Sequence, residues 1–262
     1  MAAAPKSVSG SISDIRTDIA SNDLHHIWVR GNDLTADVMG NRTFTDTIFL
    51  LIAKRFPEQN EREIVDAMLV SLMEHGLTPS AMVARVTYAV APESLQGAVA
   101  AGLLGAGGVV LGSMEECGKV LTRIASEVDA GSTQEEAIAN LVAEYRAAGK
   151  HLPGMGHAIH TEGDPRAARL FELATELGFH GRHVAALQGL ADAAARSKPL
   201  PINVTGAVAS ILLELGIPWK LHRGFALISR SAGLIAHIGE ELEQPITPAI
   251  RALMRSAAKE DA

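Results

Sequence analysis

The sequence predicts a mainly α-helical protein with little or no sheet. Apolar residues recur every three or four positions along most of the chain, which is the period of a helix with one buried face. Capping residues and prolines precede many of these segments, and glycines often follow them, as at the two ends of helices. One segment, "HHIWVRG" at residues 25–31, is the only stretch that predicts a strand.

The first helices are expected near the N-terminus. Residues 45–56 predict an apolar helix, and residues 60–75 predict a second, with acids in its first turn and Gly76 as its stop. Thr78 is placed to cap a third helix that begins at Pro79. This part of the chain therefore forms consecutive helices with short connections.

Two later helix starts follow the same rules, and glycines interrupt the pattern twice. Thr133 and Glu136 have the spacing of a capping box, and Asp164 precedes a proline as an N-cap. Residues 101–116 contain too many glycines for an undisturbed helix, and residues 149–164 predict a loop that turns tightly or approaches a ligand. If the chain has two domains, such segments join them.

Composition limits the class of protein. The 262 residues are 47% hydrophobic and can bury a full core in one domain or two. A net charge of −7 disfavours general nucleic-acid binding. The chain has a single cysteine, Cys117, which excludes an internal disulfide and a thiolate-rich zinc site. No apolar segment reaches transmembrane length, and we expect no signal peptide. We expect a cytoplasmic, enzyme-sized protein that binds neither nucleic acid nor membrane.

The glycine-rich loop carries the residues that indicate chemistry. His157 suits a general acid or base, because the ordinary pKa of histidine lies near neutral pH; a purely structural loop histidine remains an alternative. With His160 it resembles a metal pair, but no converging partner is visible in the sequence, so no metal is expected. Arg166 in the first turn of a helix is unusual for a cation and indicates an anion site for a carboxylate.

His75 lies at the end of a predicted helix, where the helix dipole favours its protonated form. A simple C-terminal cap is the alternative.

Six motifs in series resemble the citrate synthase superfamily, above all its short members, the citryl-CoA lyases, and the citryl-CoA-cleaving C-terminal domain of ATP-citrate lyase. They run from about residue 26 to 245 and read "VRGNDLTADVMGNRTFTDTIFLLI", "MEHG", "GLLGAGGVVLGSMEE", "GMGHAIHTEGDPR", "INVTGAVASILLELGIP" and "SRSAGLIAHIGEELEQP". The resemblance implies a citrate synthase-like helical fold and a homodimer. It implies a large domain of residues 1–112 and 217–262 and a small domain of residues 113–216.

The resemblance also implies roles for single residues. His157 matches a histidine that exchanges a proton with the carbonyl or hydroxyl oxygen of the oxaloacetate moiety, and His75 matches a substrate-binding histidine. Both are predicted catalytic residues. Arg166 and Arg230 match arginines that hold its carboxylates. The segment along which CoA lies matches Pro153, Gly154, Met155 and Gly156. No metal and no cofactor beyond the CoA thioester substrate are implied.

Three positions depart from the synthase pattern. Val110 replaces a histidine that stabilises the enolate of acetyl-CoA, Thr205 replaces the aspartate base, and Gln244 replaces an arginine contributed across the dimer. A threonine cannot be the base near neutral pH, so Thr205 is predicted to bind the substrate and not to act as a base. The backbone amides of residues 107–112 are the alternative donors to the enolate oxygen.

These departures favour cleavage over condensation. We expect citryl-CoA lyase-like cleavage of a 3-hydroxy-3-carboxyacyl-CoA to an acyl-CoA and a 2-oxo acid such as oxaloacetate, with acyl-CoA and a di- or tricarboxylate as ligands. A non-catalytic CoA-ester binding protein and a CoA-ester hydrolase remain alternatives.

Overall fold

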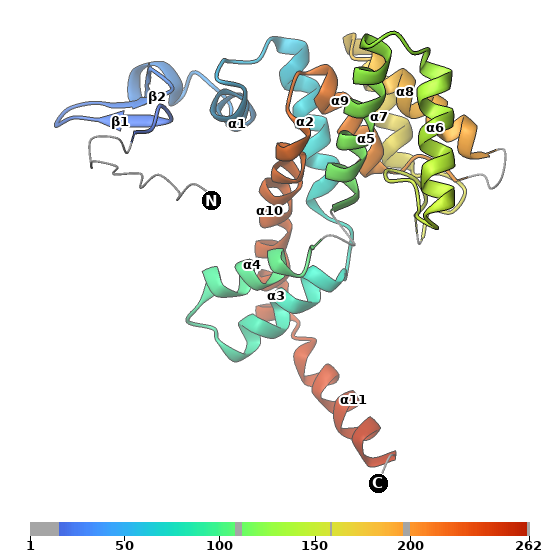
Figure 1. Ribbon diagram of the computed structural model, residues 1–262. Coiled ribbons are helices and arrows are strands. Elements are labelled where there is room, and N and C mark those ends of the chain that lie inside the picture. Colours follow the sequence, from blue (N-terminus) through green and yellow to red (C-terminus); the bar gives the residue numbers. More distant parts are fainter. Residues whose placement is uncertain (1–15, 108–111, 158, 196–199, 261–262) are drawn as a thin grey trace, which may run out of the picture. The chain divides into compact units, whose positions relative to one another are not determined.

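Helices make up most of the structure, so the predicted mainly α fold is confirmed (Figure 1). The computed structural model describes residues 16–107, 112–157, 159–195 and 200–260. The chain divides between residues 62 and 63 into two compact units. The division into a large and a small domain that the family resemblance implies stays a prediction.

The first unit contains a small antiparallel sheet with the strand order β1-β2-β3. Its strands are Ala20–Asn22 (β1), Ile27–Val29 (β2) and Asn32–Asp33 (β3). The prediction of a single strand is wrong, because strands of two or three residues are too short to show an alternating pattern. Helix α1, Phe44–Ala53, follows, and Thr43 caps it. Its last residue, Ala53, lies three residues before the predicted end, because Lys54 takes a left-handed conformation.

Helices near both ends of the second unit pack together. They are α2 (Gln59–Met73, which begins in the first unit), α3 (Pro79–Val90), α4 (Leu95–Leu104), α10 (His222–Glu243) and α11 (Thr247–Glu260). Thr78 caps α3 as expected. Ala84 and Ala98 pack against Leu234 on α10. A Cβ at Gly102 would collide with Leu234, so this glycine allows α4 to approach α10 closely.

The middle of the second unit is built around a buried helix. Its helices are α5 (Gly112–Asp129), α6 (Gln134–Ala147), α7 (Pro165–Leu177), α8 (Arg182–Ala195) and α9 (Val204–Glu214). Helix α9 contacts α5, α7 and α8, and its residues 204–212 are all buried. The predicted capping box of Thr133 and Glu136 and the Asp164 cap are both present. The N-terminus of α9 is thereby fixed between the other helices.

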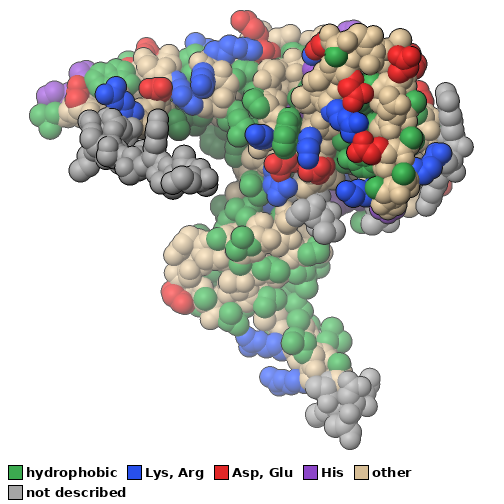
Figure 2. All heavy atoms as spheres, in the orientation of Figure 1, with side chains coloured by type: hydrophobic (Ala, Val, Ile, Leu, Met, Phe, Trp, Pro, Cys, Tyr) green, Lys and Arg blue, Asp and Glu red, His purple; other side chains and the backbone are tan. Residues whose placement is uncertain are grey.

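Charged side chains of both signs lie interspersed on the face shown in Figure 2. Arg123, for example, contacts Glu127 and Glu144 on the surface, a kind of ion pair that contributes at most about 1 kcal/mol. Within the described residues, every helix is too short or too polar to cross a membrane.

Candidate active site

The glycine-rich loop before α7 lies against the N-terminus of α9. Gly154 and Gly156 have φ values of +80° and +73°, a left-handed conformation that favours glycine. The Gly156 N–H donates to the carbonyl of Pro201 at 2.8 Å, and the Asn203 N–H donates to the carbonyl of Gly154 at 3.0 Å. The Asn203 side chain also donates to the Gly156 carbonyl at 2.7 Å. Hydrogen bonds of the loop backbone with Pro201 and Asn203 therefore hold the loop against the start of α9.

These bonds refine the expectation for the CoA segment. Pro153, Gly154, Met155 and Gly156 lie together on this loop, as the sequence requires. The N–H of Gly156 already donates to the carbonyl of Pro201 and is therefore not free to meet a ligand. Met155 forms an isolated antiparallel bridge with Ile202.

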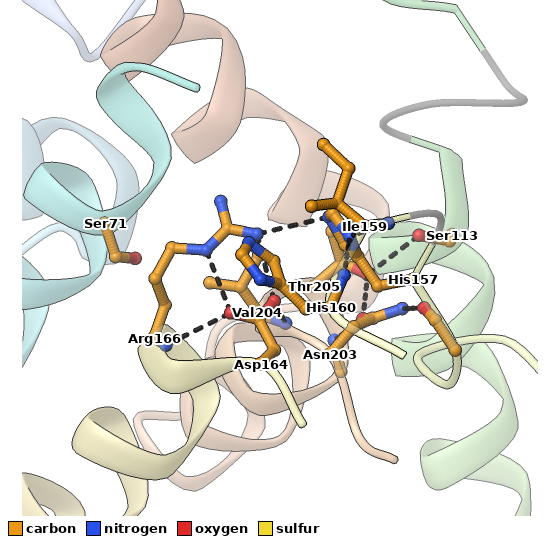
Figure 3. Close-up of polar contacts among 12 residues, drawn as sticks. Ser71, Ser113, His157, Ile159, His160, Asp164, Arg166, Asn203, Val204 and Thr205 are labelled. Atoms are coloured by element: carbon orange, nitrogen blue, oxygen red, sulfur yellow. Dashed lines mark hydrogen bonds and ion pairs between the residues drawn. The ribbon is translucent and has the colours of Figure 1, made fainter. Parts of the chain in front are cut away.

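Asp164 holds Arg166 beside His157. The Asp164 carboxylate accepts from Nε and Nη2 of Arg166 at 3.0 and 2.9 Å and from the backbone N–H of Val204 at 2.9 Å (Figure 3). Burial raises the pKa of Asp164, but these bonds outweigh it and hold the pKa below its ordinary value. Arg166 Nη2 lies 3.5 Å from Nε2 of His157. A carboxylate between two helix N-termini therefore offsets the charge of Arg166 and aims it at the loop.

Three histidines converge at this point. The ring of His157 lies 5.3 Å from that of His75 and 4.6 Å from that of His160, between centroids. Burial and the charge of Arg166 lower the pKa of His75, and burial, His160 and Arg166 lower that of His157. The expectation of a protonated His75 is therefore wrong. The ring lies beyond the last helical residue, Met73, where burial and Arg166 outweigh the helix dipole.

The proton of His157 can be placed from its hydrogen bonds. Its Nδ1 accepts from the backbone N–H groups of Ile159 and His160, both at 3.1 Å. A ring nitrogen that accepts a hydrogen bond carries no proton, so the neutral ring carries its proton on Nε2. His157 is thus a hydrogen-bond donor towards any oxygen that lies beside Arg166.

The same protonation state disfavours a metal ion. Ligand atoms of His75, His157 and His160 all lie within 4.8 Å of one another, so the converging partner that the sequence did not reveal is present. Nε2 of a neutral histidine binds a metal when its proton is on Nδ1, and in His157 that nitrogen faces two N–H donors. Arg166 adds a positive charge 3.5 Å from Nε2. The residues fit an oxyanion better than a cation.

Arg230 approaches the same region from α10 and is short of partners. It is 8% exposed, and its Nη1 has no hydrogen-bond partner among the described residues. Its nearest printed carboxylate oxygen, Glu74 Oε1, lies 3.6 Å from Nη1. Burial lowers the pKa of Arg230, an effect that Glu74 partly opposes. A buried guanidinium with an unused N–H group suits an anionic ligand.

Glu74 joins several of these groups. Its Oε1 accepts from the backbone N–H of His75 at 2.7 Å and lies 3.0 Å from Nε2 of His237. A Cβ at Gly233 would collide with the Met73 carbonyl, so that the end of α2 lies directly on α10. The sequence alone assigns Glu74 no role, although its position beside His75 in "MEHG" indicates that it lies near the site.

Thr205 lies at the buried start of α9. Its hydroxyl donates to Oδ1 of Asn203 at 2.7 Å and lies 2.8 Å from Oγ of Ser113 (Figure 3). Ser113 and Asn203 are therefore additional polar groups that the sequence reasoning missed. Val110 lies outside the described residues. So does most of the segment 107–112, whose backbone amides are expected to supply the oxyanion donors. Gln244 follows α10, and its carbonyl accepts from Arg85 on α3.

The comparisons with known proteins agree with this fold. Residues 37–253 match the family model described as citrate synthase, C-terminal domain, and the chain therefore belongs to the citrate synthase family. It is 31% identical over 192 residues to citrate synthase 2 of Bacillus subtilis. The matched region covers 71% of this chain and 49% of that protein. The chain thus spans about half the length of the curated synthases that it matches.

Solved structures extend the comparison. The structure of citryl-CoA lyase from Hydrogenobacter thermophilus superimposes with a TM-score of 0.78 and 35% identity, covering 88% of each chain. ATP citrate lyase from Methanosaeta concilii, in complex with (3S)-citryl-CoA, superimposes with a TM-score of 0.74 at 20% identity, covering 88% of this chain and 40% of the other. The second match shows a shared fold.

Proposed function

We propose that the protein is a carbon–carbon lyase that cleaves citryl-CoA, or a related 3-hydroxy-3-carboxyacyl-CoA, to an acyl-CoA and a 2-oxo acid such as oxaloacetate. The observation that carries this proposal is Arg166 beside His157, with the incompletely paired Arg230 next to Glu74, the neighbour of His75 in the chain. Two guanidinium groups suit two carboxylates, and the Nε2–H of His157 suits the oxygen between them. The similarity to citryl-CoA lyase over nearly the whole of both chains supports the same substrate class.

The contacts of Thr205 favour cleavage over condensation. Condensation begins with removal of a proton from the α-carbon of acetyl-CoA, a weak carbon acid, and this needs a base. The Thr205 hydroxyl is bonded to Asn203 and Ser113 and has no accessible basic form near neutral pH. Cleavage begins instead at the hydroxyl group, which is the more acidic end of the reaction. In this proposal water protonates the enolate that cleavage releases, so that cleavage needs no side-chain acid at the position of Thr205.

The predicted CoA segment supports a thioester ligand. Gly154 is buried against Cys117 and Gly206, so the half-buried Gly156 is the bare backbone that a narrow chain such as pantetheine can approach on the way to His157. In this proposal, Pro153 and Met155 line the same path. The reaction proceeds without a metal ion.

The experiment is incubation of purified protein with citryl-CoA and a panel of related 3-hydroxy-3-carboxyacyl-CoA esters, with all products followed by mass spectrometry. We expect an acyl-CoA and a 2-oxo acid, with formation strongly reduced in His157→Ala. Free CoA with an intact carbon skeleton would instead show a hydrolase. Binding of the ester without any product would show a non-catalytic binding protein.

A homodimer remains part of the proposal. Large apolar side chains are exposed on α3, α4, α10 and α11, and they suit a second copy of the chain better than water. They are Val83, Val90, Leu95, Leu104, Ile235, Leu242, Leu253 and Met254. Light scattering should give twice the monomer mass of 27.6 kDa, and a monomer at all concentrations would contradict the proposal.

A further inference from the structure

Helix α10 presents two nitrogen donors on one face. Arg230 and His237 are two helical turns apart, so their side chains lie on the same side of the helix. Gly233 lies between them, and a Cβ there would collide with the Met73 carbonyl and meet Oε2 of Glu74 at 2.7 Å. The missing side chain of Gly233 therefore leaves room for the carboxylate of Glu74 between the arginine and the histidine.

Both donors face the same oxygen atom of Glu74. Nε2 of His237 lies 3.0 Å from Oε1, which is a hydrogen-bond distance, whereas Nη1 of Arg230 lies 3.6 Å from it, which is too far for a hydrogen bond. The backbone N–H of His75 also donates to this oxygen, at 2.7 Å. Nη1 of Arg230 is left with no hydrogen-bond partner among the described residues. The histidine therefore occupies the acceptor that the guanidinium would otherwise use.

His237 acts as the donor in its bond to Glu74. Burial raises the pKa of Glu74, but hydrogen bonds from His237 and His75 and the charge of Arg230 outweigh it and hold the pKa below its ordinary value. An ionised carboxylate only accepts hydrogen bonds, so Nε2 of His237 carries a proton. On the other side of the buried ring, Nδ1 lies 3.8 Å from Oε2 of Glu240. The ring is thus held between two carboxylates.

Hydrogen bonds rather than packing fix the side chain of Glu74. This residue follows Met73, the last residue of α2, and its side chain is 41% exposed. A shift of about 0.7 Å would bring Oε1 to an ordinary hydrogen-bond length of about 2.9 Å from Nη1 of Arg230. Pairs of carboxylate and guanidinium form strong, charge-assisted hydrogen bonds. Without the bond to His237, Glu74 would therefore pair with Arg230.

Building on the lyase function proposed above, in which Arg230 binds a carboxylate of the substrate, we propose that His237 is a positioning residue that holds Glu74 away from Arg230 and so keeps this guanidinium available to the ligand. Loss of the histidine turns Glu74 into an internal competitor, which is present at a high effective concentration because it belongs to the same chain. The effect falls on binding and not on the chemical step, because His237 acts on the ligand only through Glu74.

The test is a double-mutant cycle at positions 74 and 237. His237→Phe keeps a ring but removes the N–H donor. We expect it to raise Kd for oxaloacetate, measured by titration calorimetry, and KM for citryl-CoA about 10-fold, with little change in kcat. In the background of Glu74→Gln, which removes the charge that would pair with Arg230, the same substitution should raise both by less than about 2-fold. His237→Gln, which keeps an N–H donor, should retain most of the affinity.

The outcomes separate a positioned carboxylate from simple packing. An equal rise in Kd for His237→Phe with and without Glu74→Gln, or a lower kcat at unchanged KM, would overturn the role of His237. Thermal melting curves check that each variant is folded, and His237→Leu replaces His237→Phe in the cycle if the larger ring prevents folding.

The same measurements distinguish this role from the lyase function. A wild-type protein that binds oxaloacetate and shows the non-additive pattern, but forms no 2-oxo acid from any ester, would support the role of His237 and overturn the lyase function. A wild-type protein that binds no oxaloacetate would overturn the role of His237.

Discussion

Two buried arginines, Arg85 on α3 and Arg230 on α10, differ in what neutralises them. Arg85 on α3 is 2% exposed and donates to Glu241 at 2.7 Å, to Glu240 at 2.5 Å and to a backbone carbonyl. Arg230 is 8% exposed, yet among the described residues its Nη1 makes no hydrogen bond, and Glu74 lies 3.6 Å away. A buried charge that the protein pairs fully belongs to the fold, whereas one left incompletely paired is available to a ligand.

The largest effect is expected from Arg85→Met. Removal of this cation leaves Glu241 buried without its partner, so the free energy of unfolding should fall by about 3–5 kcal/mol. Urea denaturation followed by circular dichroism measures it. Arg123→Met, which removes surface ion pairs, is the control and should cost less than about 1 kcal/mol. A loss as small as that of the control would show that the buried pair contributes little.

Arg230→Met should have the opposite profile. The free energy of unfolding should change by less than about 1 kcal/mol or increase, because a buried and incompletely paired charge is removed. The value of kcat/KM for citryl-CoA should fall by about 10²–10³-fold, because a charge-assisted bond to a carboxylate is lost. Steady-state kinetics and urea denaturation of the same protein test both halves. A variant as unstable as Arg85→Met would remove the distinction between the two arginines.

Acid should weaken the Arg85 network. Burial raises the pKa of Glu241, but backbone N–H groups of Ile246 and Thr247 and the side chain of Arg85 lower it to about 2, from an ordinary value of 4.5. A lowered carboxylate pKa stabilises the fold fully above pH 4.5, and this stabilisation is lost as the pH falls towards 2. It amounts to about 3 kcal/mol. Between pH 6 and 3, wild type should therefore lose more stability than Glu241→Gln; equal losses would contradict the assignment.

The smallest effect is expected at Glu74. Glu74→Ala removes the acceptor that His75 and His237 share and the carboxylate that lies beside Arg230, so KM for citryl-CoA should rise about five-fold, the equivalent of one hydrogen bond. Glu74→Gln, which keeps an acceptor oxygen, should recover most of this loss. If the two variants were equal, charge rather than positioning would explain the effect.

Local features of the site could be predicted from the sequence, and contacts between distant segments could not. The Asp164 cap and the nearness of His157 to Arg166 depend on one loop and the helix that follows it. Arg230 and His75 join the site only through packing of α2 on α10, for which Gly233 leaves room. No periodicity reports such a contact, and the motif resemblance alone placed these residues together.

Protonation states were the least predictable property. Helix position alone suggested a charged His75, but burial and Arg166 come from tertiary structure and reverse the preference. The proton of His157 likewise depends on two backbone N–H groups in a loop that the sequence predicts only as rich in glycine and tightly turned.

The contact between Gly154 and Gly206 has a consequence for the entropy cost of ligand binding. A Cβ at Gly206 would overlap the Gly154 carbonyl, and a Cβ at Gly154 would meet Sγ of Cys117 at 2.7 Å, so the loop backbone lies directly on α9 and α5. A loop held in this way has little conformational entropy to lose when a ligand lies along it. Amide hydrogen exchange at Asn203, whose N–H is bonded to Gly154, should therefore be as slow in the free protein as in its complexes.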